Sequence, residues 1–198
     1  MTRRPAALVL TALTLAGCTR IEIVDDGLNF ERRQAELAGI TNWDLQGGIV
    51  IDTGEDRGQS RFSWRQRADR LELEINGRLG VGRALIEGDE SSLTIRARGE
   101  TRVLTDPERE LSEMLGWWMP VTSAEHWLLG RPDPDYPDRR LPGPYDTLAT
   151  LTQRDWQISY DQYQLVDGRL VPERITLTHA PLELRLRITD FEPVFGEP

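Results

Sequence analysis

The chain of 198 residues contains no lysine, so its basic side chains are arginines and two histidines. A P-loop needs a lysine on the nucleotide phosphates, and Schiff-base catalysis needs a lysine amine. The chain therefore carries neither kind of site, and we expect it to act without hydrolysing ATP itself.

Cysteine and histidine are almost as scarce. Cys18 is the only cysteine, so no disulfide can form within the chain. His126 and His179 lack a second histidine at metal-ligand spacing, and no Gly-x-Ser-x-Gly nucleophile elbow occurs. We expect no metal, no cofactor and no enzymatic activity, and a partly buried structural role for His126. Asp133 and Asp135 could mimic a glycosidase pair, but solvation in a proline-rich loop explains them better.

Long hydrophobic runs are absent as well. The apolar stretch of residues 6–15 is shorter than the roughly 20 residues that a membrane-spanning helix needs. It follows Arg3 and Arg4 and ends in Leu15-Ala16-Gly17-Cys18, the order of a secretory signal that resembles a bacterial lipobox. We therefore expect residues 1–17 to be a signal peptide, Cys18 to be lipidated, residues 18–24 to form a tether and residues 25–198 to form one domain.

The formal net charge is −9, and loss of Arg3 and Arg4 with the signal makes it more negative. Such a body repels nucleic acid and anionic headgroups, so no nucleic-acid partner is expected. Acyl chains and any apolar loop must then provide the membrane binding. An aspartate directly after the lipidated cysteine resembles a signal that retains lipoproteins in the inner membrane. This chain has Thr19 at that position, so we expect it on the periplasmic face of the outer membrane.

Alternating apolar and polar residues predict many short antiparallel strands with one apolar face. The pattern is strict in residues 71–75 and is followed by Asn76-Gly77, a strong signal for a hairpin turn. The predicted strands are residues 43–51, 61–65, 71–75, 81–86, 93–97, 101–104, 156–160, 174–178 and 182–188.

Only a few short helices accompany these strands. One is predicted over residues 27–38, and another after Asp106 as N-cap with Pro107 at its first position. Thr122 and Glu125 have the spacing of a capping box for a third. Residues 131–144 hold five prolines and predict a long exposed loop.

About nine to eleven strands and three helices predict a fold that is mainly β with some α. A single antiparallel sheet of that size curls, and a few helices over its mouth leave an apolar cavity. The alternative is a β-barrel whose interior is filled by its own side chains.

Several segments resemble one family, LolB, the outer-membrane receptors of the Lol lipoprotein-sorting pathway. The best match runs from Leu115 to Val121 and continues in residues 125–130, like that family's central helical signature. Further likeness is found in residues 43–47, 62–64, 76–80, 156–160 and 170–175.

The resemblance implies an incomplete antiparallel barrel with a helical lid. It also implies that the protein accepts lipoproteins from a periplasmic carrier, LolA, binds their acyl chains and inserts them into the outer membrane. We expect such a receptor to be a monomer. The alternative is a structural or assembly lipoprotein that binds another envelope protein.

The resemblance also implies a membrane-inserting loop at Arg78, Leu79 and Gly80, with Leu79 at its exposed tip. Here Arg78 replaces the proline that is common in the family, and the alternative is a leucine packed against the sheet edge. Broad apolar side chains suit acyl chains, which offer no directional contacts. The alternative for each such residue is an ordinary side chain of the core. The predicted cavity or gate residues are Trp43, Phe62, Trp64, Trp117, Trp118, Met119, Trp127, Trp156 and Tyr160.

Overall fold

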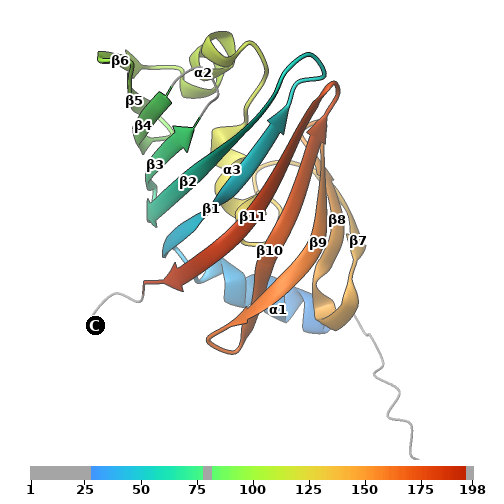
Figure 1. The fold of residues 1–198 in the computed structure, drawn as a ribbon. Coiled ribbons are helices and arrows are strands. Elements are labelled where there is room, and N and C mark those ends of the chain that lie inside the picture. The colour runs from blue at the N-terminus through green and yellow to red at the C-terminus, as the bar shows by residue number, and fades with distance from the viewer. Residues whose placement is uncertain (1–27, 78–81, 195–198) are drawn as a thin grey trace, which may run out of the picture.

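The computed structural model describes residues 28–77 and 82–194. Within these ranges the backbone forms one antiparallel sheet of eleven strands with three α-helices (Figure 1). The strands are β1 (Asn42–Asp52), β2 (Arg57–Arg67), β3 (Arg70–Gly77), β4 (Gly82–Asp89), β5 (Ser92–Ala97), β6 (Glu100–Leu104), β7 (Asp138–Pro142), β8 (Leu148–Gln153), β9 (Trp156–Val166), β10 (Arg169–His179) and β11 (Leu182–Pro193).

The sheet consists of two meanders joined by the pairing of β1 with β11. Its strand order is β6-β5-β4-β3-β2-β1-β11-β10-β9-β8-β7, so β6 and β7 form its edges and the barrel is incomplete. The predicted curled antiparallel sheet with short helices is thus confirmed. Pro142 lies in the edge strand β7, where a residue without an amide hydrogen costs no pairing.

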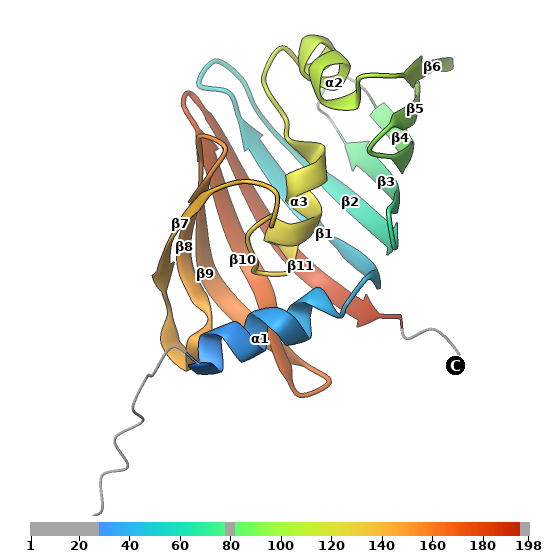
Figure 2. The same cartoon turned by 180° about the vertical axis from the view of Figure 1, so that it is seen from behind.

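The helices lie on the concave side of the sheet and at its two ends. Helix α3 (Val121–Leu128) lies within the curve, α1 (Leu28–Ala38) crosses one end, and α2 (Pro107–Leu115) lies at the other end (Figures 1 and 2). None of the helices in the described part of the chain is long and apolar enough to cross a membrane.

The apolar face of the sheet forms the core because alternate strand residues point inward. Near α1 the core is aromatic: the Trp43 ring lies 5.8 Å from Trp64 and 6.2 Å from Phe191, centroid to centroid. Leu37 of α1 is 1% exposed. This end of the half-barrel is therefore filled by the protein's own side chains.

Three local predictions were wrong. Asn76 and Gly77 do not form the turn, because they continue β3 and pair with Arg83 and Gly82. Thr122 does not cap α3, which begins at Val121, because its hydroxyl donates instead to Glu108 Oε1 at 2.6 Å.

The third error concerns the proline-rich segment, which contains β7 rather than loop alone. Strand β8, which follows it, was not predicted at all. The prolines allow β7 because it pairs on one side only, with β8.

Candidate functional site: an apolar cavity

A cavity of about 1100 Å³ lies between the curled sheet and the helices. Its walls come from β1 to β6, β10 and β11 on one side and from α2, α3 and the segment between them on the other. Pockets for small molecules enclose roughly 300–1,000 Å³, so this cavity is at or above the upper end of that range.

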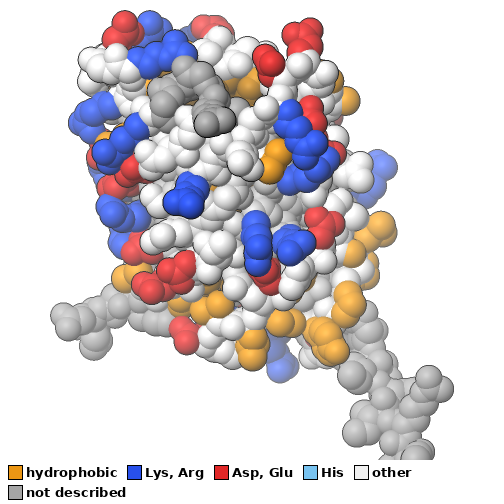
Figure 3. Space-filling view, viewed as in Figure 1, with side chains coloured by type: hydrophobic (Ala, Val, Ile, Leu, Met, Phe, Trp, Pro, Cys, Tyr) orange, Lys and Arg blue, Asp and Glu red, His pale blue; other side chains and the backbone are white. Residues whose placement is uncertain are grey.

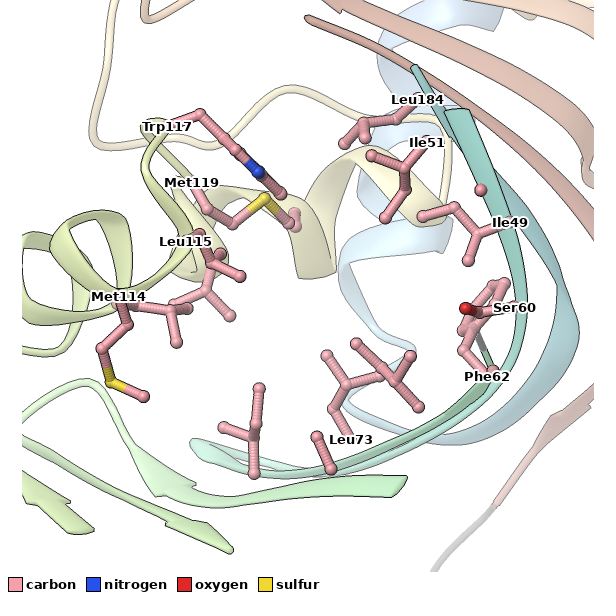
Figure 4. A pocket seen from close by; sticks show the side chains of 18 of the residues that line it. Ile49, Ile51, Ser60, Phe62, Leu73, Met114, Leu115, Trp117, Met119 and Leu184 are labelled. Atoms are coloured by element: carbon pink, nitrogen blue, oxygen red, sulfur yellow. The ribbon is translucent and has the colours of Figure 1, made fainter. Parts of the chain in front are cut away.

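Most side chains of the sheet wall are aliphatic or aromatic, and its charged residues, Arg57, Glu100 and Arg102, come from β2 and β6. Because side chains alternate along a strand, Phe62 and Trp64 of β2 and Leu73 and Ile75 of β3 face the cavity. Phe62 and Leu73 are labelled in Figure 4. The other strand residues that contribute apolar side chains are Ile49, Ile51, Ala84, Ile86, Ile95, Ala97, Ile175, Leu177, Leu184 and Leu186.

The opposite wall is formed where α2 ends. Gly116 has φ 77° and accepts the left-handed backbone that terminates this helix. The chain then turns, so that Trp117 and Met119 line the cavity together with Met114 and Leu115 (Figure 4). Met114 and Leu115 are 44% and 40% exposed, which is unusual for apolar residues on the inner side of a helix and leaves them open to the cavity and to solvent.

The predicted cavity residues fall into two groups. Phe62, Trp64, Trp117, Met119 and Trp127 line the cavity. The other four, which lie behind or beside its lining, are Trp43, Trp118, Trp156 and Tyr160.

Trp43, Trp156 and Tyr160 contact lining residues from outside the cavity, and Trp43 does so through the Trp64 ring, 5.8 Å away centroid to centroid. Trp156 is fully buried and lies 6.3 Å from the Trp127 ring. Tyr160 donates a hydrogen bond to the Trp127 carbonyl at 3.1 Å. Trp118 packs edge-on against His179 at 5.8 Å, with the Arg154 guanidinium 5.0 Å from its centroid.

Aliphatic residues make up most of the lining, and none of those on the strands was among the predicted cavity residues. Their signal was present in the alternation of β3, β4, β10 and β11. An aliphatic residue in such a pattern does not reveal whether it faces a packed core or open space, and so the predicted cavity residues were aromatic apart from Met119.

A buried polar cluster holds the helical wall in place. Asp133 is 4% exposed, which corrects its prediction as a solvated loop residue. Its carboxylate accepts a hydrogen bond from Ser123 Oγ at 2.5 Å, and its backbone exchanges two bonds with the Gln153 side chain. A buried carboxylate needs such donors. Since Ser123 belongs to α3 and Gln153 to β8, these bonds join the proline-rich segment to both elements.

A second polar contact joins the cluster to α2. Arg154 forms a bidentate ion pair with Glu108 of α2, with distances of 2.8 and 2.6 Å, and also donates to Ser123 Oγ at 3.0 Å. The guanidinium thus fixes α2 and α3 to the turn between β8 and β9.

Glu125 and His126 lie on α3 outside the cavity lining. Burial raises the pKa of Glu125 to about 7, and the nearby carboxylates of Glu90 and Asp133 add to the effect. Burial also lowers the pKa of His126, whose Nε2 is 3.5 Å from Glu125 Oε1. These two residues form a half-buried contact rather than part of the cavity.

Two predicted sites fall outside the residues that the structure describes. They are the lipidation site Cys18 and the loop of Arg78, Leu79 and Gly80. Strands β3 and β4, which lead to and from that loop, are described up to Gly77 and from Gly82.

Comparisons with solved structures agree with this architecture. A LolA-superfamily protein from Nitrosomonas europaea superposes with a TM-score of 0.56 at 8% identity, covering 86% of this chain and 96% of that one. A DUF1329 family protein from Desulfovibrio piger gives a TM-score of 0.53 at 7% identity, covering 85% and 93%. Both likenesses concern the fold alone.

Sequence comparisons identify the family. The family model described as outer membrane lipoprotein LolB matches residues 41–191. Outer-membrane lipoprotein LolB of Pseudomonas aeruginosa PAO1 is 31% identical over 194 residues, covering 94% of this chain and 95% of the relative. The Pseudomonas fluorescens relative is 33% identical over 159 residues, covering 80% and 78%. The chain therefore belongs to the LolB family of outer-membrane lipoproteins, whose role is in lipoprotein localisation.

Proposed function

We propose that this protein accepts acylated lipoproteins from a LolA-type periplasmic carrier and inserts them into the outer membrane. In this proposal the acyl chains occupy the cavity during transfer. The observation that supports it is an apolar space of about 1100 Å³ inside a protein that is otherwise highly charged.

The physical need for such a space is large. Exposing an acyl chain of about fifteen methylenes to water costs on the order of 12 kcal/mol, at about 0.8 kcal/mol per methylene. A triacylated lipoprotein multiplies this cost. An apolar container removes most of it for the chains that it encloses.

Transfer then runs down a gradient of affinity. The carrier binds the acyl chains weakly, this cavity binds them more tightly and the bilayer binds them most tightly. No P-loop lysine exists in the sequence, so the proposal needs no nucleotide at this step.

Attachment to the membrane completes the proposal. Cys18 carries the lipid anchor on the periplasmic face, and two or more acyl chains hold a protein stably on a bilayer. Residues 78–80 form the loop that enters the membrane, with Leu79 at its tip.

The experiment that tests the function is transfer of a labelled lipoprotein from loaded carrier to liposomes through the purified protein. The proposal expects transfer in the absence of any nucleotide. A requirement for added ATP at this step would contradict it. Mass spectrometry of the Cys18→Ala chain provides a second readout, because co-purified acylated cargo supports a receptor and a chain without cargo supports the assembly role.

Replacement of Leu79 separates uptake from delivery. We expect Leu79→Glu to leave cargo uptake nearly intact and to lower delivery to liposomes at least tenfold, because only insertion needs an apolar tip. Leu165→Glu is the matched control, since Leu165 is 69% exposed on β9 and should affect neither step. Loss of folding in Leu79→Glu would show instead that the side chain belongs to the core.

A further inference from the structure

Ser60 is an exception in the apolar wall of the cavity. It lies on β2 opposite Ile49 of β1 and two residues before Phe62, and it is 7% exposed. Figure 4 shows its side chain on the curved wall of the cavity between these two apolar side chains.

The Ser60 hydroxyl has no hydrogen-bond partner among the described residues. A buried polar group without a partner is costly, and such groups are few in folded proteins. A valine or an alanine at this position would cover the wall without that cost. The serine therefore has no evident role in stabilising the sheet.

The neighbouring strand leaves room for this hydroxyl. Gly77 of β3 pairs with Ser60, and a Cβ built on Gly77 would lie 2.2 Å from Ser60 Oγ and 2.6 Å from Ser60 Cβ. Any other residue at position 77 would displace the serine side chain. The glycine and the serine together place one hydroxyl beside the apolar side chains of Ile49 and Phe62.

The cavity has a polar end and an apolar interior. Its charged lining residues come from the β1–β2 hairpin, with Asp56 and Arg57, and from the β5–β6 turn and β6, with Arg98, Glu100 and Arg102. Further along β2 the inward residues are Phe62 and Trp64, beyond which Trp127 lines the opposite wall. Ser60 thus lies at the boundary between the polar end and the apolar interior.

An acyl ester likewise has a polar group at one end and a hydrocarbon tail at the other. Its hydrocarbon tail belongs in the apolar interior, and its carbonyl oxygen is an acceptor for one hydroxyl donor. We propose that Ser60 is a lipid-binding residue that donates a hydrogen bond to the ester carbonyl of a bound acyl chain, while the tail extends past Phe62 toward Trp64. This inference rests on the proposed function and adds to it the chemical group that the cavity recognises.

The test compares two lipids that differ only in that carbonyl. Monopalmitoylglycerol has an ester, and hexadecylglycerol has an ether in its place. Their dissociation constants are measured on the Cys18→Ala chain by displacement of a fluorescent fatty acid, and the result is the ratio of ether to ester dissociation constants. A single hydrogen bond of ordinary strength corresponds to a factor of about 2 to 10 in this ratio.

We expect Ser60→Ala to lower the ratio by that factor while hexadecylglycerol binds as before. Ser63→Ala is the matched control, because Ser63 lies on the same strand, half-buried, and does not line the cavity. Ser60→Cys keeps the size of the side chain but weakens the hydrogen-bond donor, so it should also lower the ratio. This variant replaces Ser60→Ala in the test if the alanine variant folds poorly.

The outcomes separate this inference from the function that it extends. An unchanged ratio in both Ser60 variants, with both lipids still bound, overturns the role of Ser60 and leaves the acyl-binding cavity standing. Failure of the unmodified cavity to bind either lipid overturns the proposed function and this inference together.

Discussion

At the scale of single residues, Glu125 couples the stability of the fold to pH. Its carboxyl has a pKa of about 7 in the folded chain and 4.5 as its ordinary value. Between these two values the folded state binds more protons than the unfolded state. Stability from this group is therefore fully present below about pH 4.5 and is lost as the pH rises through 7.

Replacement of Glu125 by glutamine should remove this dependence. We expect the free energy of unfolding of the wild type, relative to Glu125→Gln, to fall by roughly 1–3 kcal/mol between pH 4.5 and 8, at about 1.36 kcal/mol per pKa unit. Urea unfolding at several pH values measures the difference. Parallel stability profiles for the two proteins would show that the carboxyl ionises normally in the fold.

The environments of single side chains were the features that the sequence predicted least well. Asp133 and Asp135 lie in the same proline-rich segment, yet Asp133 is buried and hydrogen-bonded to Ser123 and Gln153. Only these partners, which are distant in the sequence, explain the burial of Asp133. Trp117 and Trp118 are adjacent residues of the same type, but after the left-handed Gly116 only Trp117 lines the cavity. Such differences depend on tertiary contacts that periodicity does not contain.

At the scale of elements, the contact between β1 and β11 unites the two halves of the sheet. The pairing shifts register between Gln46 and Gly47. A Cβ at Gly47 would lie 2.3 Å from the Arg187 carbonyl oxygen, whereas a Cβ at Gly48 would lie 3.9 Å from the Ser60 carbonyl oxygen, an ordinary van der Waals contact. The strands therefore approach each other closely at one glycine and not at the next.

Gly47→Ala should destabilise the protein by about 1–3 kcal/mol, the usual cost of forcing extra atoms into a packed site. Gly48→Ala is the control and should change the free energy of unfolding by less than about 0.5 kcal/mol. Thermal or urea unfolding of both variants provides the measurement. Equal stability of the two would mean that the strands separate easily at this bulge.

The helical wall depends on Arg154 in a comparable way. Its ion pair with Glu108 is partly buried, with Arg154 10% and Glu108 21% exposed in their side chains. Arg154→Ala leaves that carboxylate unpaired and should cost about 3 kcal/mol. Arg109→Ala removes exposed pairs with Asp106 and Glu113 and should cost about 0–1 kcal/mol. Similar costs for the two would show that α2 is held mainly by apolar contacts.

Elements were predicted more successfully than residues. Strict alternation in β3, β5 and β11 located those strands because one face is apolar and the other is polar. Strand β8 was missed because it follows the prolines and its sequence, Leu148–Gln153, gives only a short alternation. The turn after β3 was misplaced because Asn76-Gly77 satisfies a local rule that the pairing with β4 overrides.

At the scale of the whole molecule, charge and hydrophobicity are arranged on opposite sides of the sheet. The outer face carries scattered arginines and acidic residues among other polar groups (Figure 3), and Arg65 and Glu72 form a cross-strand ion pair at 2.6 Å. The inner face is apolar and encloses the cavity. A charged outer face is compatible with water, and an apolar interior is what the proposed binding of acyl chains requires.

The size of that interior could not be predicted from the sequence. Inward residues of β2 and β3 have the same character whether another side chain or empty space lies opposite. What leaves the space open is the position of α2 and of Trp117 and Met119, which line the far wall instead of filling the centre (Figure 4).

Native mass spectrometry of the Cys18→Ala chain with a synthetic triacylated lipopeptide tests the central claim most directly. Ala84 lines the cavity, so Ala84→Trp should fill part of it, while Leu85→Trp places the same ring on the other face of β4. The account predicts one lipopeptide bound to the unmodified cavity and to Leu85→Trp, with binding at least tenfold weaker in Ala84→Trp. Equal binding by all three would place the acyl chains elsewhere and contradict the account.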